Sequence, residues 1–369
     1  MKPILQSDPG AGYRAAQAQI DAAVARVLGS GNYVLGQEVT GFESEFAAWL
    51  GAPNVVSCAN GTDALVLALR AAGIGKGDAV ATVSHTAIAT VAAIEMTGAA
   101  PILLDVDEAT FTLDPAELGA VLAAPPPGLP PIRAVIPVHL YGQPAAMDAI
   151  CAQAARHGVL VIEDCAQAHG AQVAGRPVGL WGAAGTFSFY PTKNLGAFGD
   201  GGAVATNDPD LAARIGALRQ YGWDRERLAQ LPGVNSRLDE LQAAILRVKL
   251  ATLTRDNARR AEIARAYDRA LGAGAPARAA DRTHVFHQYV IRRPDRDRVQ
   301  AALRDAGIGS AIHYPAPAHL HPAYRGRVAV GPAGCRATER LVAEILSLPM
   351  HPHLSDEEVA RVCRALEAL

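Results

Sequence analysis

Lysine is scarce in this chain, and one lysine lies where its amine could react with a carbonyl group. Only four of the 34 lysines and arginines are lysines, and Lys193 stands in an aromatic and glycine-rich stretch, 186–202, that contains no other cation. A poorly solvated ammonium has a depressed pKa and becomes a nucleophile toward carbonyl carbon, which an arginine does not. Lys193 could also be an ordinary surface lysine on a loop, but its surroundings favour Schiff-base chemistry.

A free lysine amine of this kind usually works with pyridoxal phosphate, whose other requirements can be sought in the sequence. The phosphate needs backbone N–H groups at a helix start, and Asn60-Gly61-Thr62 precedes an apolar helical segment. The same pattern also fits a simple Asn N-cap. The pyridine nitrogen needs a carboxylate, and Asp164 follows the apolar run 159–162. Asp164 could equally cap a helix, but together with Lys193 it favours a cofactor site at the carboxyl end of a strand.

The segments that would position these residues alternate between two patterns. Short β-branched runs occur at 54–58, 79–83, 101–105, 134–138 and 159–163, separated by Ala- and Leu-rich helical segments at 61–72, 86–97, 114–124 and 144–157. Continuous apolar strands separated by helices predict a mainly parallel sheet covered on both faces, and therefore an α/β fold. Two further strand-like runs, 185–189 and 202–206, flank the Lys193 loop.

The ends of the chain follow other patterns. Helical periodicity covers about 13–50 with a break at 29–32, and a long helix is expected over 236–271. Beyond it, strand-like runs at 284–292 and 308–314 accompany helices near 295–306, 334–346 and 355–368. A chain of 369 residues exceeds the usual single core. We therefore predict a large domain at 1–250, with an N-terminal helical arm, and a small α+β domain at 251–369.

Composition excludes several classes of function. The net charge is about −2 and the basic residues are scattered, so no nucleic-acid partner is expected. Neither a signal peptide nor a membrane span is recognisable, and the five cysteines lack a CxxC pair, so we expect a cytoplasmic protein with reduced thiols. Metal-ligand spacing is missing from the histidine-rich C-terminal part, and no metal is expected there. That part contains His313, His319, His321, His351 and His353.

Four ordered motifs carry a resemblance to a known family. They are residues 163–171 (EDCAQAHGA), 188–194 (SFYPTKN), 199–202 (GDGG) and 235–244 (NSRLDELQAA). They resemble the DegT/StrS-type sugar aminotransferases, pyridoxal-phosphate enzymes with the type I, aspartate aminotransferase-like fold. The similarity extends from about Gly31 to Pro352. It implies a large, mainly parallel α/β/α domain and a smaller α+β C-terminal domain.

The resemblance also implies roles for individual residues. Lys193 would form the Schiff base with pyridoxal phosphate and carry protons during the transfer, and Asp164 would pair with the pyridinium nitrogen. Asn235 would reach the phosphate in the neighbouring subunit, which implies a homodimer with shared active sites. The remaining contacts are Gln167 near the phenolic oxygen, Gly61, Thr62 and Ser188 at the phosphate, and His313 and Tyr314 near the substrate.

One position departs from the family pattern. After Ser84-His85-Thr86 many relatives have an aromatic residue that stacks on the pyridine ring, whereas this chain has Ala87. We hypothesise that His85 takes the place of the missing aromatic ring at the cofactor. The alternative is that His85 is simply a hydrogen-bonded histidine at the start of a buried helix.

The resemblance implies transfer of an amino group from an amino acid, expected to be L-glutamate, to a nucleotide-linked keto sugar. The sequence from Tyr190 to Gly196, with 199–202, favours enzymes that act on 3-keto-6-deoxy sugars such as a dTDP-3-keto-6-deoxyhexose. Open alternatives are a C4 keto sugar, a keto cyclitol or an aromatic precursor. A non-enzymatic regulatory or scaffold homologue would not need Lys193 and Asp164, so their presence argues against that role.

Overall fold

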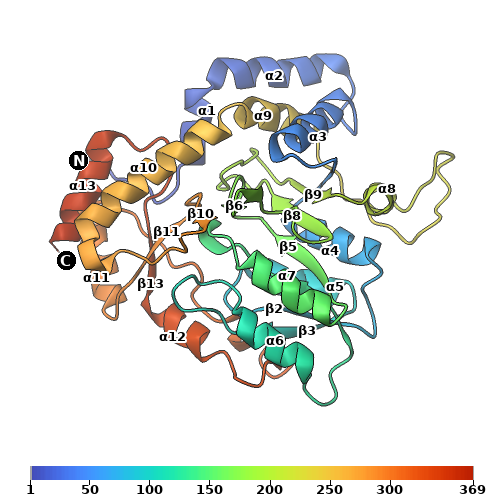
Figure 1. Cartoon of the computed structure of the whole chain (residues 1–369). Helices are drawn as coiled ribbons and strands as arrows, with labels where there is room; N and C mark the ends of the chain where they lie inside the picture. Colours follow the sequence, from blue (N-terminus) through green and yellow to red (C-terminus); the bar gives the residue numbers. More distant parts are fainter. Residues whose placement is uncertain (1, 369) are drawn as a thin grey trace.

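Eight strands form the central sheet of the computed structural model, which describes residues 2–368 (Figure 1). Within this sheet only β9 runs antiparallel to its neighbours, so the prediction of a mainly parallel sheet is confirmed. In spatial order the strands are β1 (Asn54–Cys58), β9 (Gly202–Thr206), β8 (Ala184–Ser188), β5 (Leu160–Asp164), β4 (Ile132–Ile136), β2 (Ala79–Val83), β3 (Ala100–Leu104) and β12 (Ala329–Val330).

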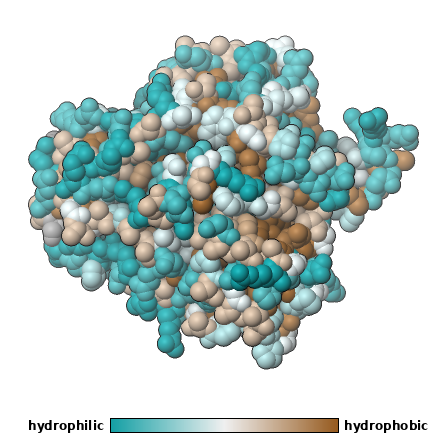
Figure 2. Space-filling view, viewed as in Figure 1, coloured by the Kyte–Doolittle hydropathy of each residue, from teal (hydrophilic) through white to brown (hydrophobic). Residues whose placement is uncertain are grey.

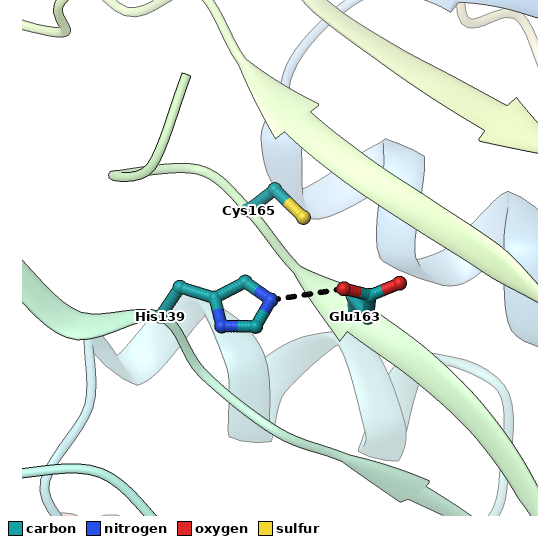
Figure 3. Close-up of side chains that lie close together, drawn as sticks. All are labelled: His139, Glu163 and Cys165. Atoms are coloured by element: carbon teal, nitrogen blue, oxygen red, sulfur yellow. Dashed lines mark hydrogen bonds and ion pairs between the residues drawn. The ribbon is translucent and has the colours of Figure 1, made fainter. Parts of the chain in front are cut away.

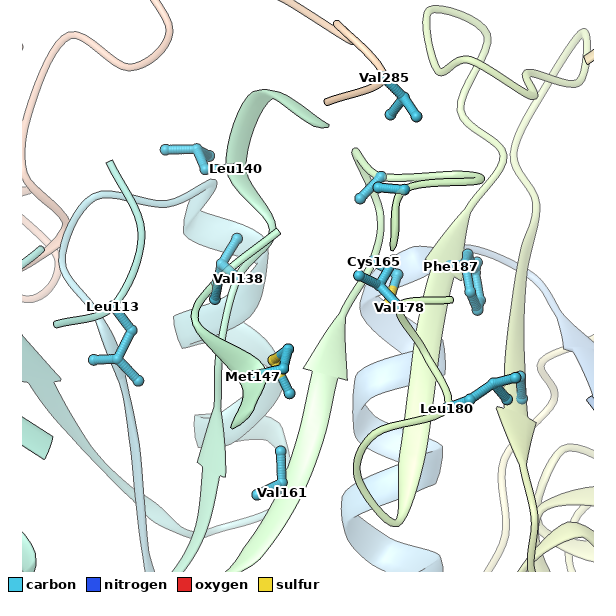
Figure 4. Packing of buried hydrophobic residues seen from close by; sticks show 14 of the residues in the cluster. Leu113, Val138, Leu140, Met147, Val161, Cys165, Val178, Leu180, Phe187 and Val285 are labelled. Carbon is cyan, nitrogen blue, oxygen red and sulfur yellow. The ribbon is translucent and has the colours of Figure 1, made fainter. Parts of the chain in front are cut away.

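Helices cover both faces of this sheet. One face packs against α4 (Gly61–Ala71), α5 (Ile88–Met96) and α8 (Pro209–Leu218). The other packs against α3 (Gln37–Leu50), α6 (Pro115–Ala123) and α7 (Met147–Arg156). Successive strand residues point to opposite faces, so Val161 belongs to one apolar cluster and Ile162 to the other. Figure 4 shows part of the first of these, where Met147 of α7 lies beside Val138 and Val161.

The C-terminal part has its own apolar cluster, which includes Ile263, Tyr289 and Leu346. Ile4 from the other end of the chain packs into the same cluster, and β12 joins the large sheet although it lies beyond residue 250. Because segments from both sides of residue 250 contribute to this cluster and to the large sheet, the predicted boundary between two domains at residue 250 stays a prediction. The elements are α9 (Glu240–Leu250), α10 (Leu253–Leu271), β11 (Tyr289–Arg292), α11 (Arg296–Asp305), α12 (Arg336–Glu344), β13 (Ile345–Leu348) and α13 (Asp356–Glu367).

Two sequence predictions in this part are wrong. The single long helix over 236–271 is two helices, because the chain breaks between Leu250 and Leu253. The run 308–314 makes only isolated bridges, at Ile308 and Ala311, and the strand that pairs with β11 is β13. Because β13 follows α12 directly with no glycine or proline between them, its apolar residues read as a continuation of the helical pattern.

Shorter elements complete the fold. They are α1 (Pro9–Ala15), α2 (Gln17–Ser30), β6 (Gln172–Val173), β7 (Arg176–Pro177), β10 (Arg282–Thr283) and the 3-10 turns Leu140–Gly142, Gly272–Gly274 and Ala318–Leu320. In Figure 2 hydrophilic residues dominate over the C-terminal helices, whereas apolar residues gather near the middle of this face. Within residues 2–368, no helix combines the length and the apolar character that a membrane crossing requires.

The sheet brings distant parts of the sequence to one edge. Asn60 follows β1, Thr86 follows β2, Asp164 ends β5 and Ser188 ends β8. These four strands are parallel, so their carboxyl ends meet on the same side. That edge is where open α/β sheets bind ligands.

Candidate active site

A cavity of about 330 Å³ opens at this edge, between the large sheet and the C-terminal part. Eight of the residues predicted from the sequence line it, whereas His85 and Asn235 do not. The eight are Gly61, Thr62, Asp164, Gln167, Ser188, Lys193, His313 and Tyr314.

Lys193 presents an unpaired amine to this cavity. No hydrogen bond or ion pair to its side chain exists within the described chain, although its neighbours are well anchored. The Nδ2 of Asn194 donates to Asn257 Oδ1 at 2.8 Å and to the carbonyl of Val285 at 2.9 Å. Burial lowers the pKa of Lys193 to about 8, and the carboxylate of Asp164 partly opposes that shift. A substantial fraction of the amine is therefore uncharged and nucleophilic at mildly alkaline pH.

The start of α4 forms an anion cradle beside Ser188. Asn60 caps the helix by accepting the N–H of Asp63 at 2.8 Å, and the N–H groups of Gly61 and Thr62 have no acceptor among residues 2–368. A Cβ on Gly61 would lie only 2.6 Å from the Cβ of Ser188. Glycine therefore allows the Ser188 hydroxyl to approach the helix start, where free N–H groups attract a phosphate.

Asp164, at the end of β5, is held in place by hydrogen bonds. Its Oδ2 accepts a hydrogen bond from Thr90 Oγ1 at 2.9 Å, and its Oδ1 accepts the N–H of Ala166 at 3.1 Å. Only 7 % of the residue is exposed. The carboxylate is thus fixed in place, with its remaining acceptor capacity available to a protonated ring nitrogen.

Gln167 and Tyr141 join the sheet to the C-terminal part. Gln167 Oε1 accepts the N–H of Tyr141 at 2.7 Å, and its Nε2 donates to the hydroxyl of Tyr314 at 3.0 Å. The Tyr141 hydroxyl in turn donates to the carbonyl of His313. Both amide atoms of Gln167 are therefore engaged, and the loop that carries His313 and Tyr314 is tied to the end of the sheet.

His85 supports this network and does not contact the cavity. Its Nε2 lies 2.8 Å from the Tyr141 hydroxyl, and its ring packs near Phe111. Since that hydroxyl donates to His313, it accepts from His85, whose pKa burial lowers to about 4. The hypothesis that His85 replaces the stacking aromatic finds no support in this geometry, because His85 is hydrogen-bonded and enclosed. Ala87, by contrast, does line the cavity.

A second polar cluster is formed by residues on either side of Asp164 in the sequence and by His139, and Figure 3 shows Glu163 facing the ring of His139 with Cys165 nearby. His139, Glu163 and Cys165 are close enough to share a metal ion. However, Glu163 accepts the N–H groups of Gly179 and Trp181, at 2.8 and 2.7 Å, and lies 3.1 Å from His139 Nε2. His139 Nδ1 accepts a further N–H, and burial raises the pKa of the Cys165 thiol well above its usual range. These hydrogen bonds hold β5, the strand that ends at Asp164, in place, which is a structural role.

The structure adds cavity residues that the sequence did not single out. His287 and Gln288 line the cavity from the segment before β11, and Tyr190 and Asp200 line it from the stretch that contains Lys193. The only available signal for His287 and Gln288 was a pair of polar residues at the start of an apolar run, which is common in strands that do no chemistry.

The residues present fit pyridoxal phosphate. A cradle for a phosphate, a fixed carboxylate and an unpaired lysine amine face one cavity, which are the three polar contacts that the cofactor requires. Gly61 fits in particular, because a side chain at that position would displace Ser188 from the cradle.

Comparison with known proteins gives the same assignment. Residues 14–367 match the DegT/DnrJ/EryC1/StrS aminotransferase family. The chain is 46% identical over 363 residues to the dTDP-3-amino-3,4,6-trideoxy-alpha-D-glucose transaminase of Streptomyces venezuelae, covering 97% of this chain and 94% of that protein.

Two solved structures are similar over most of the chain. That of S. venezuelae DesV in complex with a ketimine intermediate superimposes with a TM-score of 0.94 at 44% identity, covering 100% of this chain and 98% of that one. The NtdA protein of Bacillus subtilis, with bound cofactor PMP, has a TM-score of 0.86 at 29% identity, covering 95% and 81%. The expected type I fold is confirmed, and the chain belongs to the pyridoxal-phosphate-dependent DegT/DnrJ/EryC1/StrS aminotransferase family.

Proposed function

We propose that this aminotransferase moves an amino group from L-glutamate to a nucleotide-linked 3-keto-6-deoxy sugar, such as a dTDP-3-keto-6-deoxyhexose. The observation that carries the proposal is the unpaired, half-buried amine of Lys193 in a cavity that also presents Asp164 and the cradle at Gly61. The S. venezuelae relative, at 46% identity, is named for a dTDP-linked 3-amino sugar, which supports both the nucleotide and the position of amination.

The cavity residues that the sequence predicted each have a role in the proposed reaction. Gly61, Thr62 and Ser188 would hold the phosphate, Asp164 would keep a proton on the ring nitrogen, and Gln167 would face the phenolic oxygen. When bound, the cofactor supplies a ring that withdraws electrons from the reacting carbon. Lys193 Nζ would carry a proton from the carbon of the amino-group donor to the cofactor in the first half-reaction, and from the cofactor to the sugar carbon in the second. His313 and Tyr314 line the substrate side of the cavity.

We further propose that the enzyme is a homodimer with shared active sites. Asn235 is exposed and does not line the cavity of its own chain. It lies at the base of a loop that projects from the body of the molecule next to α8 (Figure 1). Large apolar side chains are exposed on this loop, namely Tyr221, Leu228 and Leu231. Such side chains at a projection favour contact with a second copy.

The first experiment follows the visible absorbance of the purified protein. We expect a visible band on addition of pyridoxal phosphate, its disappearance with L-glutamate in the absence of sugar, and no band in Lys193→Ala. A folded wild-type protein without such a band would refute the aminotransferase proposal. A band that responds to another amino acid and not to L-glutamate would refute the donor alone.

The acceptor and the dimer need separate tests. The glutamate-treated enzyme should recover its visible band with a dTDP-3-keto-6-deoxyhexose and not with the 4-keto isomer. Mixing Lys193→Ala with Asn235→Ala subunits should restore about a quarter of wild-type activity, because random exchange gives mixed dimers with one intact site each. No recovery, with exchange confirmed by mass spectrometry, would contradict shared sites.

A further inference from the structure

His287 is a buried histidine on the cavity wall whose ring has no partner. It is 5 % exposed and lines the cavity from the segment that precedes β11. Its Nδ1 is enclosed without a hydrogen-bond partner, and its Nε2 makes no hydrogen bond within the described residues either. Buried polar groups are nearly always paired, so an imidazole left this way at a cavity calls for a ligand.

The chemistry of the ring indicates what that ligand must offer. Burial, together with the nearby cations of Lys193 and Arg260, lowers the pKa of His287 well below its usual range, so the ring is neutral. A neutral imidazole has one N–H and one lone pair. An enclosed N–H without an acceptor is costlier than an enclosed lone pair, so the proton belongs on Nε2. His287 therefore offers the cavity a hydrogen-bond donor.

The position of the His287 N–H near Lys193 limits which group of a ligand it can bind. His287 and His313 both lie close enough to Lys193 for its charge to lower their pKa values. The amino acid that gives up its amino group must bring its amino-bearing carbon to Lys193. Its α-carboxylate is bonded directly to that carbon. In the part of the chain that the structure describes, no arginine lines the cavity. Within this chain, a carboxylate beside Lys193 therefore meets only neutral hydrogen-bond donors apart from Lys193 itself.

We propose that His287 binds the α-carboxylate of the amino donor through its Nε2–H, with the free edge of His313 beside it. His313 Nδ1 lies 2.9 Å from Ser347 Oγ, which fixes its ring and leaves its Nε2 free. The inference rests on the proposed function, because it assigns the donor carboxylate of that same reaction. His287 is then a residue that distinguishes the two half-reactions, since the keto sugar carries no carboxylate at its reacting carbon.

The test uses the cofactor-loaded enzyme and a donor analogue that binds without reacting, 2-methyl-glutamate. Its dissociation constant is read from the change in the visible spectrum, for wild type, His287→Leu and His287→Gln. A hydrogen bond to a charged group is strong, so we expect roughly ten- to hundredfold weaker binding in His287→Leu. Glutamine places an amide N–H near the Nε2 position, so His287→Gln should recover most of the affinity.

His169→Gln is the matched control. His169 is also buried and close to Lys193, but it does not line the cavity. Its replacement should leave analogue affinity within about threefold of wild type at a comparable melting temperature. The half-reaction with the keto sugar, started from the pyridoxamine form, should likewise change by less than about threefold in His287→Leu. A threefold change is smaller than the change expected when one hydrogen bond to a charged group is lost.

Two results would separate failure of the inference from failure of the proposed function. An active wild type, with unchanged analogue affinity in a folded His287→Leu, would reject the carboxylate assignment alone. Equal losses in both half-reactions would also reject it, because they would indicate a general packing defect. A wild type that responds to no amino acid would reject the proposed function and this inference with it.

Discussion

The two sides of the cavity differ in how their polar groups are paired. On the sheet side, Asp164 and Gln167 each make two hydrogen bonds to the surrounding protein. Near the reacting position, the side chains of Lys193 and His287 make none within residues 2–368. The contrast follows from their tasks. In the proposed reaction, Asp164 and Gln167 are oriented before the cofactor arrives, whereas Lys193 and His287, which would meet the substrate, stay unpaired at a cost in stability.

The largest effect is expected from Asp164→Ala, which removes a fixed group on the sheet side. Loss of the carboxylate leaves the ring nitrogen without a partner for its proton, so we expect turnover to fall about a thousandfold. Single-turnover kinetics with L-glutamate measure it. Asp148→Ala, an exposed carboxylate on α7, is the control and should be silent. A loss below tenfold for Asp164→Ala would show that the sheet side is not decisive.

An unpaired group should cost stability, and Lys193→Met tests this in the cofactor-free protein. The folded pKa, about 8, lies below the ordinary value of 10.5. Between these values the unfolded chain binds more protons, so the stability of the wild type rises with pH. We expect Lys193→Met to be more stable by about 1–3 kcal/mol below pH 8, and this advantage to vanish by about pH 10.5. Denaturant unfolding at several pH values measures it; a gain independent of pH would contradict the electrostatic cause.

The cradle is tested by Gly61→Ala. The added Cβ would meet Ser188 Cβ at 2.6 Å, so the hydroxyl must move away from the free N–H groups. We expect the dissociation constant for pyridoxal phosphate to rise about tenfold, which is the weight of one hydrogen bond. Gly216→Ala, a helical glycine with no neighbour near its Cβ, is the control. Unchanged affinity would mean that Ser188 does not hold the phosphate.

The smallest effect is expected from His85→Ala, which weakens the link between the two sides. Tyr141 would lose one of the hydrogen bonds that place the His313 loop. We expect kcat/KM for the sugar to fall about threefold to tenfold, with cofactor affinity unchanged. Spectral titration with pyridoxal phosphate is the discriminating measurement. Weaker cofactor binding would restore the idea that His85 replaces the stacking aromatic ring.

The sequence alone located most of the fold and of the candidate site. Strands 54–58, 79–83 and 202–206 agree with the structure at both ends, because the buried strands of a sheet covered on both faces are short, continuous apolar runs. Lys193 and Asp164 were found because each stands beside a recognisable motif. β13 and His287 were missed because their meaning depends on what lies next to them in space.

Local chemistry therefore determined the alternation of strands and helices, the lysine and the carboxylate. Only the tertiary structure decided which polar groups are paired. His85 and His287 are both buried histidines, yet one bonds to Tyr141 and the other faces the cavity unpaired. Hydrogen bonding between segments far apart in the chain depends on packing and not on local sequence, so no reading of the neighbours of either histidine could have separated the two.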